Sequence, residues 1–532
     1  MLYNLKWLDP GEVFPPTVEV PRIIRYKQNA RLFDGDHFAD PSFRSRSPLD
    51  IVNTEAVNLY QKCAERISQV VGNFNDIISF PVLLNYQRLL TLKTADLVCG
   101  EYPSISGVTY QENAAIKDVR DLTDFDSKLY ATVIDISRYG DAIWRIYKNE
   151  EERMDFTCWD PCEWYPVVAQ DGTNRIKYHC LCWLVNVNED QLNPNYELNV
   201  QIHGTDKDTV GYYEYRRYAM SNGGNQITKL LESKQINTGL DRCAVFNLRS
   251  FSTSDSVYGY DDYMPLDSLL SEIMVRVGQI SCILDKHADP SITGPVSMLR
   301  INPETGEYYL ETGKFYGVSA GEEYPKYMTW DGQLSSAFEQ LEFLIKQLYI
   351  LSEMGAALLG YDNGGTAISG TAFRFRMANP LARVRRIANS LSVPVRKLFS
   401  SLSVTAEVDE TDREIKEDDP KSQELELPIP YRRISVFWSD GLPDDPRENV
   451  EIAKLACGEE HMMPLELAIM EYFGRSNEEA REWIQMLEVE ARKREDVEED
   501  TNHPGPQDGT GVNPQRKGSS TGLNDFHGLN NQ

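Results

Sequence analysis

Two long segments in the middle of the chain carry apolar residues at helical spacing. In Asp262–His287 and again in Gln333–Leu359, apolar positions recur in steps of three and four, which predicts two helices with one narrow apolar seam each. At 1.5 Å per residue, each helix is about 38 Å long. The seam residues are Leu266, Leu269, Ile273, Val277, Ile280 and Leu284, then Leu334, Phe338, Leu341, Ile345 and Leu348. A hairpin of two such helices leaves much surface uncovered, so we expect copies of it to pack side by side.

The composition changes abruptly between and after these two helices. Residues 288–332 are dense in Gly, Pro and aromatic residues, and they predict a compact insert at the tip of the hairpin. The Gly-rich segment Gly360–Gly370 predicts a flexible connection. A long basic helix follows at 371–402, in which Pro380 and Pro394 should cause a kink or an end, because each removes a backbone donor and clashes one turn back.

The first half of the chain passes from helical spacing to strand alternation. Residues 1–50 show little periodicity and predict an extended arm. Helical spacing predicts helices at 54–74, 81–99 and 121–138. Alternation of period two then predicts strands at 142–147, 154–159, 164–168, 175–184, 212–218 and 227–233. Helices followed by strands joined through tight turns predict an α+β body with an antiparallel sheet.

The last part of the chain returns to this body and then becomes helical. Residues 428–438 predict a strand that rejoins the sheet region. Short amphipathic helices are predicted at 447–457, 464–473 and 476–494. From residue 498 to residue 532 the chain is rich in Gly, Asn and Pro with few apolar residues, so we expect disorder there. The predicted fold class is therefore α+β, mainly helical.

The composition limits the classes of function that fit the chain. The net charge of −28 and the pI near 4.7 argue against a protein that grips nucleic acid over its whole surface, because tight binding comes from neutralising phosphates. DNA handled without adhesion remains compatible with this charge. Nine Cys without framework spacing indicate reduced thiols and an intracellular origin. The chain starts without a signal-peptide pattern and no apolar run approaches 18 residues, so we expect no membrane span.

The sharpest charge asymmetry lies in the basic helix, since no Asp or Glu occurs from Asn363 to Ala406. One interpretation is contact with DNA phosphates along a channel. The other is pairing with acidic side chains of the same or the next subunit, which the acidic composition favours. The basic residues are Arg374, Arg376, Arg383, Arg385, Arg386, Arg396 and Lys397.

Two patterns resemble chemical sites without completing one. The Gly-rich segment lacks the Gly-Lys-Ser/Thr ending of a nucleotide-binding loop. A zinc site could be drawn from Cys158, Cys162, His179, Cys180 and Cys182. Strand alternation puts Cys180 and Cys182 on the face opposite His179, and a Cys-x-x-Cys knuckle is missing, so we expect buried strand cysteines instead. No catalytic constellation stands out, and we expect no cofactor, no metal and no enzyme activity.

Several segments, in order, resemble those of one family. They are Tyr86–Pro103, Tyr139–Tyr147, Trp159–Pro161, Tyr165–Val167, Ser256–Asp262, Asp289–Pro290, Gly294–Pro295, Ser369–Ala372, Leu442–Asp445 and Met463–Leu467. Together they are similar to the portal proteins, or head-tail connectors, of tailed bacteriophages, over roughly Arg25 to Arg494. Met463-Pro464 departs from the pattern, because family members more often begin that helix with Ser or Thr.

The resemblance implies a ring, usually a dodecamer, at one vertex of the capsid, through which double-stranded DNA is packaged and later ejected. The implied regions are an N-terminal arm (1–50), a wing (51–261), a first stem helix (262–287), a clip (288–332), a second stem helix (333–359), a tunnel loop (360–370), a spine helix (371–402), a wing return (403–439), a helical crown (440–497) and a tail (498–532). The chain would belong to the virion, with assembly in the host cytoplasm.

The resemblance also implies roles for named residues and for partners. Loop residues Asn363, Gly364, Gly365 and Thr366 would lie closest to DNA. Arg374, Arg376, Arg383, Arg385 and Arg386 of the spine helix would contact DNA or a neighbouring subunit. The clip would dock the terminase large subunit and later the head–tail adaptor through Tyr308, Tyr309, Phe315, Tyr316, Tyr324 and Tyr327. Major capsid and scaffolding proteins would surround the ring.

Two alternatives stay open at this point. The chain could be another virion structural protein, such as an adaptor or a capsid component, in which the long helices build a trimer or a shell lattice. Less expected is a metal-dependent nucleic-acid enzyme that uses some of the scattered carboxylates.

Overall fold

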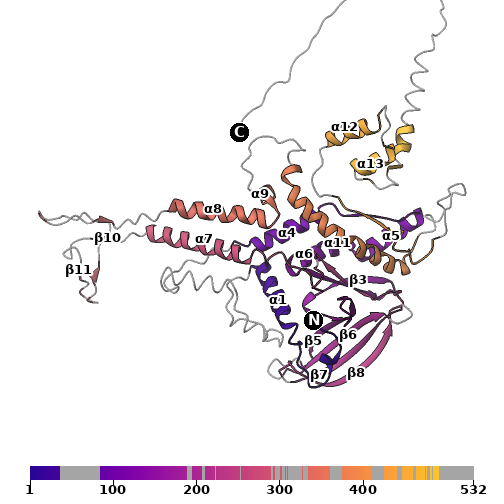
Figure 1. Cartoon of the computed structure of the whole chain (residues 1–532), viewed down its shortest axis with the longest axis horizontal. Helices are drawn as coiled ribbons and strands as arrows, with labels where there is room; N and C mark the ends of the chain where they lie inside the picture. Colours follow the sequence, from indigo (N-terminus) through magenta and orange to yellow (C-terminus); the bar gives the residue numbers. More distant parts are fainter. Residues whose placement is uncertain are drawn as a thin grey trace, which may run out of the picture. The chain divides into compact units, whose positions relative to one another are not determined.

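The computed structural model divides the chain into two compact units, Met1–Asp445 and Pro446–Gln532 (Figure 1). The fold is a mixture of helices and antiparallel sheets, as the sequence predicts. The structure describes residues 1–35, 84–188, 194–205, 210–221, 223–251, 253–288, 292–293, 300–301, 303, 306, 308–309, 321, 326–327, 334–359, 374–408, 425–439, 446–458, 463–473, 475, 480–481 and 483–489.

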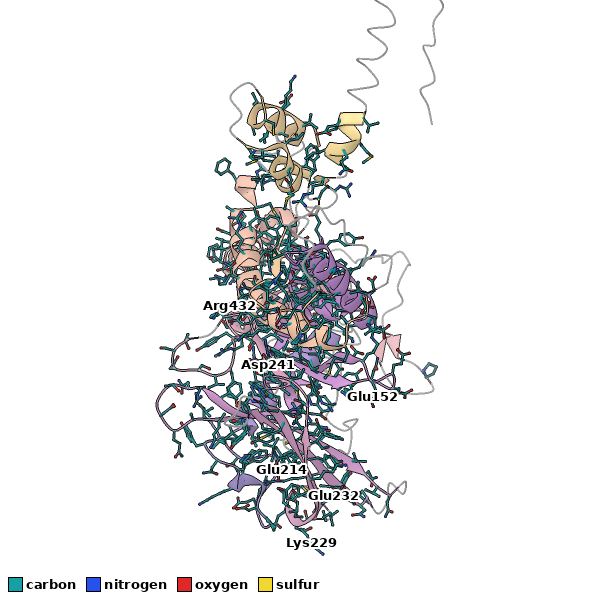
Figure 2. The ribbon with its side chains drawn as sticks, turned by 90° about the vertical axis from the view of Figure 1, so that its right-hand side faces the viewer. Glu152, Glu214, Lys229, Glu232, Asp241 and Arg432 are labelled. Atoms are coloured by element: carbon teal, nitrogen blue, oxygen red, sulfur yellow. The ribbon has the colours of Figure 1, made fainter. Side chains whose placement is uncertain are left out.

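A five-stranded antiparallel sheet forms one part of the first unit. Its strands, in spatial order, are β4 (Trp164–Val168), β5 (Ile176–Asn186), β6 (Tyr196–Thr205), β7 (Gly211–Met220) and β8 (Ile227–Asn237). Alternation predicted four of these strands and missed β6. Lys229 and Glu232 stand on β8, the edge of the sheet (Figure 2), where charged side chains oppose edge-to-edge pairing with another chain.

A three-stranded antiparallel sheet lies in the order β3 (Met154–Trp159), β2 (Asp141–Lys148) and β9 (Val245–Arg249). The central strand is buried on both faces. Trp144 of β2 belongs to the main core, whereas Ile143 packs with Trp164 and Leu181 in a smaller core that joins the two sheets.

The N-terminal residues do not form the expected extended arm. A 3-10 helix, η1 (Lys6–Leu8), is followed by helix α1 (Val20–Asp34), and Gly35 ends α1 in a left-handed conformation with φ of 88°. Trp7 and Phe14 pack with Tyr165 in the core of the five-stranded sheet. These aromatic residues bury the segment, but their irregular spacing gives no helical or strand periodicity of apolar positions. The prediction of an extended arm was therefore wrong for residues 1–35.

Three helices that pack on the main core precede, in the sequence, the strands of the two larger sheets. Helix α4 (Tyr86–Cys99) confirms the prediction at 81–99 within the described residues, whereas the helix predicted at 54–74 lies outside them. The helix predicted at 121–138 is α6 (Phe125–Tyr139), and it is preceded by an unpredicted helix, α5 (Tyr110–Thr123). Asp124 separates α5 from α6, because it adopts a left-handed conformation with φ of 47°.

The two long central helices form an antiparallel pair. Figure 1 shows α7 (Asp267–Ala288) and α8 (Leu334–Leu351) side by side. Leu270 near the start of α7 and Leu348 near the end of α8 both lie in the main core, so these ends of the two helices pack into the same core. Each helix is shorter than predicted. Residues 262–266 form a lead-in to α7, and α8 ends at Leu351, before Glu353 (φ 58°) and a short helix, α9 (Gly355–Leu358).

The basic helix α11 (Ala378–Leu402) runs through both of its prolines. Pro380 lies in the first turn, where a missing backbone donor costs little, and Pro394 lies inside the helix, which continues to Leu402. The expectation that a proline ends this helix is therefore wrong. Burial of an apolar face in the main core holds it together; the buried residues there include Val384, Ile387, Leu391, Val395 and Leu398.

The return strand is confirmed, although it is shorter than the predicted 428–438. Strand β14 (Ser435–Phe437) pairs antiparallel with β1 (Ser104–Ser106). Among the described residues between α7 and α8, β10 (Ile292–Thr293) pairs with β13 (Lys326–Tyr327), and β11 (Arg300–Ile301) pairs with β12 (Tyr308–Tyr309).

The second unit is helical, with α12 (Pro446–Ala456) and α13 (Leu465–Phe473) close to the predicted bounds. Residues 480–481 and 483–489 are also helical, and Arg481 pairs with Glu466 of α13 at 2.7 Å. In neither unit do the described residues include a helix long and apolar enough to cross a bilayer.

Candidate functional site

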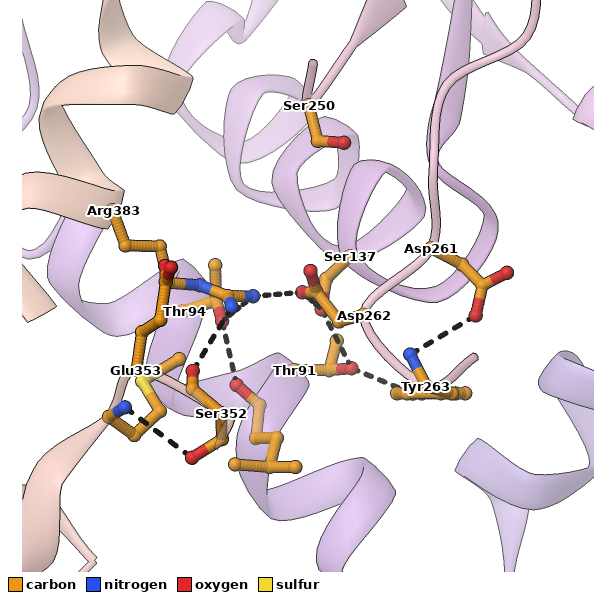
Figure 3. Close-up of polar contacts among 12 residues, drawn as sticks. Thr91, Thr94, Ser137, Ser250, Asp261, Asp262, Tyr263, Ser352, Glu353 and Arg383 are labelled. Carbon is orange, nitrogen blue, oxygen red and sulfur yellow. Dashed lines mark hydrogen bonds and ion pairs between the residues drawn. The ribbon is translucent and has the colours of Figure 1, made fainter. Parts of the chain in front are cut away.

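The best-defined polar site lies where the α7–α8 hairpin joins the body. We call it the junction: the lead-in Asp261–Tyr263, Arg25 of α1, the turn Ser352–Glu353 after α8, the facing residues of α4 and α6, and Arg383 of α11 (Figure 3). Six segments far apart in sequence therefore meet at one place, and two of them, the acidic lead-in and the basic helix, stood out in the sequence.

A buried ion pair between Arg383 and Asp262 stands at the centre of the junction (Figure 3). The two side chains are only 11% and 13% exposed. Burial raises the pKa of Asp262, against the opposing effect of the Arg383 charge. Arg383 also donates to the Ser352 carbonyl at 3.2 Å and to Thr94 Oγ1 at 3.3 Å. One guanidinium therefore contacts α4, the lead-in and the end of α8.

Hydroxyl groups fix the other side of the Asp262 carboxylate. Ser137 Oγ of α6 donates to Asp262 at 2.5 Å, and the Asp262 amide donates back to the Ser137 carbonyl at 2.9 Å. Thr91 Oγ1 lies 2.7 Å from the Tyr263 hydroxyl and 3.1 Å from Ser137 Oγ. The lead-in is thus held through both backbone and side chains.

Arg25 of α1 forms a second clamp on the same segment. Its guanidinium contacts Asp261 at 2.8 Å and Asp267 at 2.5 Å. Asp261 also accepts hydrogen bonds from the amides of Tyr263 and Met264, while Asp267 is the first residue of α7, where a negative charge favours the helix. Helix α1 therefore fixes where α7 begins.

Two glycines allow the lead-in to cross the end of α6. A Cβ on Gly259 would stand 2.0 Å from the Gly140 carbonyl oxygen, and Gly140 itself has φ of 85°. Neither position accommodates a side chain. The Gly259 amide donates to Asp141 at 3.0 Å, and the Tyr26 hydroxyl donates to the same carboxylate at 2.6 Å. Burial raises the pKa of Asp141 to about 6.

Of the basic residues predicted for a helix at 371–402, Arg383, Arg385 and Arg386 lie in α11, whereas Arg374 and Arg376 precede it. Arg383 pairs with Asp262, and Arg386 pairs with Glu353 at a more exposed position. For these two, pairing with acidic side chains of the same chain is confirmed. Three further arginines have exposed side chains, and their predicted contact with DNA or with another subunit stays a prediction; they are Arg374, Arg376 and Arg385.

Most of the other predicted site residues are outside what the structure describes. Asn363, Gly364, Gly365 and Thr366 of the Gly-rich segment, and Phe315, Tyr316 and Tyr324 of the insert, are not among the described residues. Tyr308 and Tyr309 form strand β12, and Tyr327 belongs to β13. The docking role of these tyrosines stays a prediction.

The cysteines considered for zinc lie in three separate cores. Cys180 and Cys182 are buried in the core of the five-stranded sheet, Cys162 packs with Tyr26 and Tyr139, and Cys158 lies against the main core. His179 instead accepts a hydrogen bond from Trp164 Nε1 at 3.2 Å. The interpretation as buried strand cysteines is therefore confirmed for Cys180 and Cys182, whereas Cys158 of β3 is half-buried and Cys162 is buried in the 3-10 helix Pro161–Glu163. Among the described residues, no group of three His, Cys, Asp or Glu side chains is arranged to hold a metal ion.

Sequence reasoning found the acidic lead-in and the basic helix but not their connection. The missed residues are Arg25, Thr91, Thr94, Ser137 and Ser352. Arg25 gave no signal, since it lies 236 positions from Asp261 in a segment without periodicity. The carboxylates of Asp261, Asp262, Asp267 and Glu353 each pair with an arginine, so the geometry suits a structural connection between elements and not proton transfer.

Comparison with known proteins adds little to this geometry. No family model and no curated protein matches the chain. Among solved structures, a chain of the "Neck of native GTA particle computed with C12 symmetry" is 11% identical, with a TM-score of 0.37 over 73% of this chain and 89% of that chain. A chain of the "Virion of native gene transfer agent (GTA) particle" is 12% identical, with a TM-score of 0.37 over 77% of this chain and 92% of that chain. Likeness at this level carries no argument about function.

Proposed function

We propose that the chain is a portal subunit, which assembles with copies of itself into a ring that conducts double-stranded DNA into and out of a viral capsid. The proposal rests on the resemblance of the sequence segments and on one observation in the fold. That observation is the α7–α8 pair, two long antiparallel helices that are rooted in the body at one end only.

The surface of the pair supports packing between copies. Phe343 and Ile350 of α8 are 59% and 62% exposed, and Leu284 of α7 and Phe338 of α8 are also about half exposed. Large apolar side chains gathered on one hairpin mark a surface that another protein covers. In a ring, the hairpin of the neighbouring subunit would cover it, and the repeated hairpins would line a tube.

The charge of the chain suits a channel through which DNA slides. A chain with a net charge of −28 has few positive side chains in excess that could neutralise DNA phosphates, so its adhesion to DNA is weak. The Gly-rich segment Gly360–Gly370 would narrow the channel, with the uncharged residues Asn363, Gly364, Gly365 and Thr366 closest to DNA. A dodecamer is the ring size that the resemblance implies.

The proposed ring has partners at both ends. Tyrosines and phenylalanine of the insert between the stem helices would dock the terminase large subunit during packaging and the head–tail adaptor afterwards, since aromatic residues are enriched at such interfaces. Major capsid and scaffolding proteins would contact the body. ATP hydrolysis would belong to the motor, and the chain would end in the virion after assembly in the host cytoplasm.

The junction gives this assembly a physical link. Arg383 belongs to the helix that follows the Gly-rich segment, and Asp262 belongs to the lead-in of the first stem helix. Because the ion pair joins the two, movement of the segment near DNA and movement of the stem would be coupled.

A packaging measurement tests the proposal. Replacing Gly364-Gly365 by Pro-Pro stiffens the segment, and we expect rings of unchanged size but particles with a strongly reduced content of DNA. Quantification of nuclease-protected genomes in particles made with the variant provides the readout, and a Pro-Pro replacement in the tail at Asn530-Asn531 is the control. Normal genome content in the Gly364-Gly365 variant would contradict the proposed role.

A further inference from the structure

A second polar cluster lies between the two sheets, on the side away from the main core. Ile143 of β2 packs with Leu181 of β5 there, and the rings of Trp159 and Trp183 meet edge to face with centroids 5.5 Å apart. Residues two apart on a strand share a face. Arg145 of β2 therefore points into the same space as Ile143.

Arg145 brings an uncompensated positive charge into this space. Its guanidinium stands 5.5 Å from the Trp159 ring centroid and 5.9 Å from that of Tyr147. Within the part of the chain that the structure describes, Arg145 forms no ion pair and its Nε has no hydrogen-bond partner. The chain carries 82 acidic and 54 basic side chains. Acidic residues are therefore abundant, and their number does not explain why Arg145 has no acidic partner.

His203 of β6 faces the same space from the other sheet. It is 1% exposed, and its ring stacks on Tyr213 at 5.1 Å. His203 Nε2 lies 3.1 Å from Gln201 Oε1, whereas Nδ1 has no partner among the described residues. Burial lowers the pKa of His203, and the positive charge of Arg145 acts in the same direction.

Two more side chains present unpartnered polar atoms on this face. Trp159 and Asn247 are both directly opposite Ile143, one on each neighbouring strand, so they flank it on the same face as Arg145. Trp159 Nε1 and both polar atoms of the Asn247 amide lack partners in the described part of the chain. A buried polar group without a partner destabilises the fold, and the concentration of such groups here indicates a site that a bound group completes.

We propose that this inter-sheet cluster binds a single small oxyanion of the carboxylate class, with Arg145, Trp159 Nε1 and the Asn247 amide as donors. Three of the unpartnered atoms are donors, and one of them carries a positive charge. A water molecule would satisfy a donor but would not balance the charge. Arg145, Trp159 and Asn247 are half-buried residues, and their unpartnered polar atoms lie inside the cluster.

The carboxylate has two possible sources, a free anion or an acidic side chain of a second copy of the chain. The experiment uses the full chain and sodium acetate as the probe, with sodium chloride at matched ionic strength as the reference. We expect the midpoint of thermal unfolding to rise saturably with acetate and the tryptophan emission to change with the same saturation. R145Q should weaken the apparent affinity for acetate at least tenfold.

A matched control is available on the opposite face of the five-stranded sheet. Arg216 of β7 is already paired with Glu214 at 2.7 Å, so R216Q should leave the acetate response unchanged. If R145Q does not fold, the emission titration of the wild-type protein and of W159F decides, because loss of the Trp159 ring should reduce the signal and its saturation.

Sedimentation with and without saturating acetate separates the two sources. Dissociation of an assembly by acetate indicates that a second copy supplies the carboxylate, and saturable stabilisation with unchanged sedimentation indicates a free anion. The proposal is overturned if acetate acts no differently from chloride, or if R216Q loses the response as fully as R145Q does.

Discussion

The Arg383–Asp262 pair shows how much the junction depends on single side chains. Both partners are almost fully buried, and their mutual attraction is balanced against the loss of hydration. Such a pair adds little stability in itself, but removing one partner leaves a buried charge without compensation. The junction is therefore expected to be more sensitive to a single substitution than to the loss of the whole pair.

The first prediction concerns this pair. D262N should lower the free energy of unfolding by about 3 kcal/mol or more, because Arg383 is then left buried without a carboxylate. Urea unfolding followed by circular dichroism measures the change. R386Q provides the control on the same helix. The side chains of Arg386 and Glu353 are 46% and 41% exposed, so their ion pair should contribute about 0–1 kcal/mol to the free energy of unfolding. Equal effects of the two substitutions would contradict the central place given to Asp262.

The second prediction concerns pH. Burial, with the neighbouring Asp160 charge, raises the pKa of Glu163 to about 7 from the ordinary 4.5. The folded chain therefore holds the proton of the Glu163 carboxyl more tightly than the unfolded chain does. The resulting contribution to the free energy of unfolding is fully present below about pH 4.5 and is lost as the pH rises through about 7. E163Q should be more stable than wild type at pH 8, by on the order of 2 kcal/mol, and equal to it at pH 4.5.

Urea midpoints at pH 4.5 and pH 8 for wild type and E163Q provide the test. E151Q, in an exposed turn, is the control and should follow the wild-type pH dependence. The account of Glu163 fails if E163Q and wild type lose stability in parallel as the pH rises.

Which residues would meet at the junction could not be predicted from the sequence. The acidic lead-in and the arginine-rich helix were both visible, but pairing needs the fold to bring Asp262 and Arg383 together. Arg25 lies in a segment that the sequence patterns predicted to be extended. A long-range ion pair leaves no periodic trace along the chain, and this explains why its members were found only in the structure.

At the level of elements, periodicity predicted most of the described fold. The α7–α8 seam, strand β5 and the return to the body through β14 all follow from it. Other parts of the fold were missed or misplaced, among them α1, α5, β6 and the end of α8. Strand β6 alternates apolar Leu198, Val200 and Ile202 with polar residues, which is the pattern of a strand, so its signal was present in the sequence and was overlooked. Helix α8 ends at Leu351 without a proline, because the left-handed conformation of Glu353 interrupts it.

The third prediction concerns the exposed face of α8. F343D should leave the far-ultraviolet circular dichroism unchanged, since Phe343 is 59% exposed in the single chain, and should prevent assembly, since a charge would then lie in the interface between hairpins. Sedimentation velocity measures the assembly. V187D changes an equally exposed apolar residue after β5 and should assemble normally. Normal assembly of F343D would remove the hairpin from the interface.

At the level of the whole molecule, the proposed function depends on assembly and not on a chemical site. The carboxylates of the junction are held by arginine, and the buried cysteines lie in separate cores. The chain carries a strongly negative charge together with an exposed apolar hairpin. These properties fit a subunit that surrounds DNA without adhering to it.

The most direct test of the central claim is electron microscopy of the purified full chain together with native mass spectrometry. We expect class averages of a ring with an axial hole, and a mass of twelve times the 60.7 kDa chain. A monodisperse trimer or monomer at all protein concentrations, without ring-shaped particles, would contradict the account.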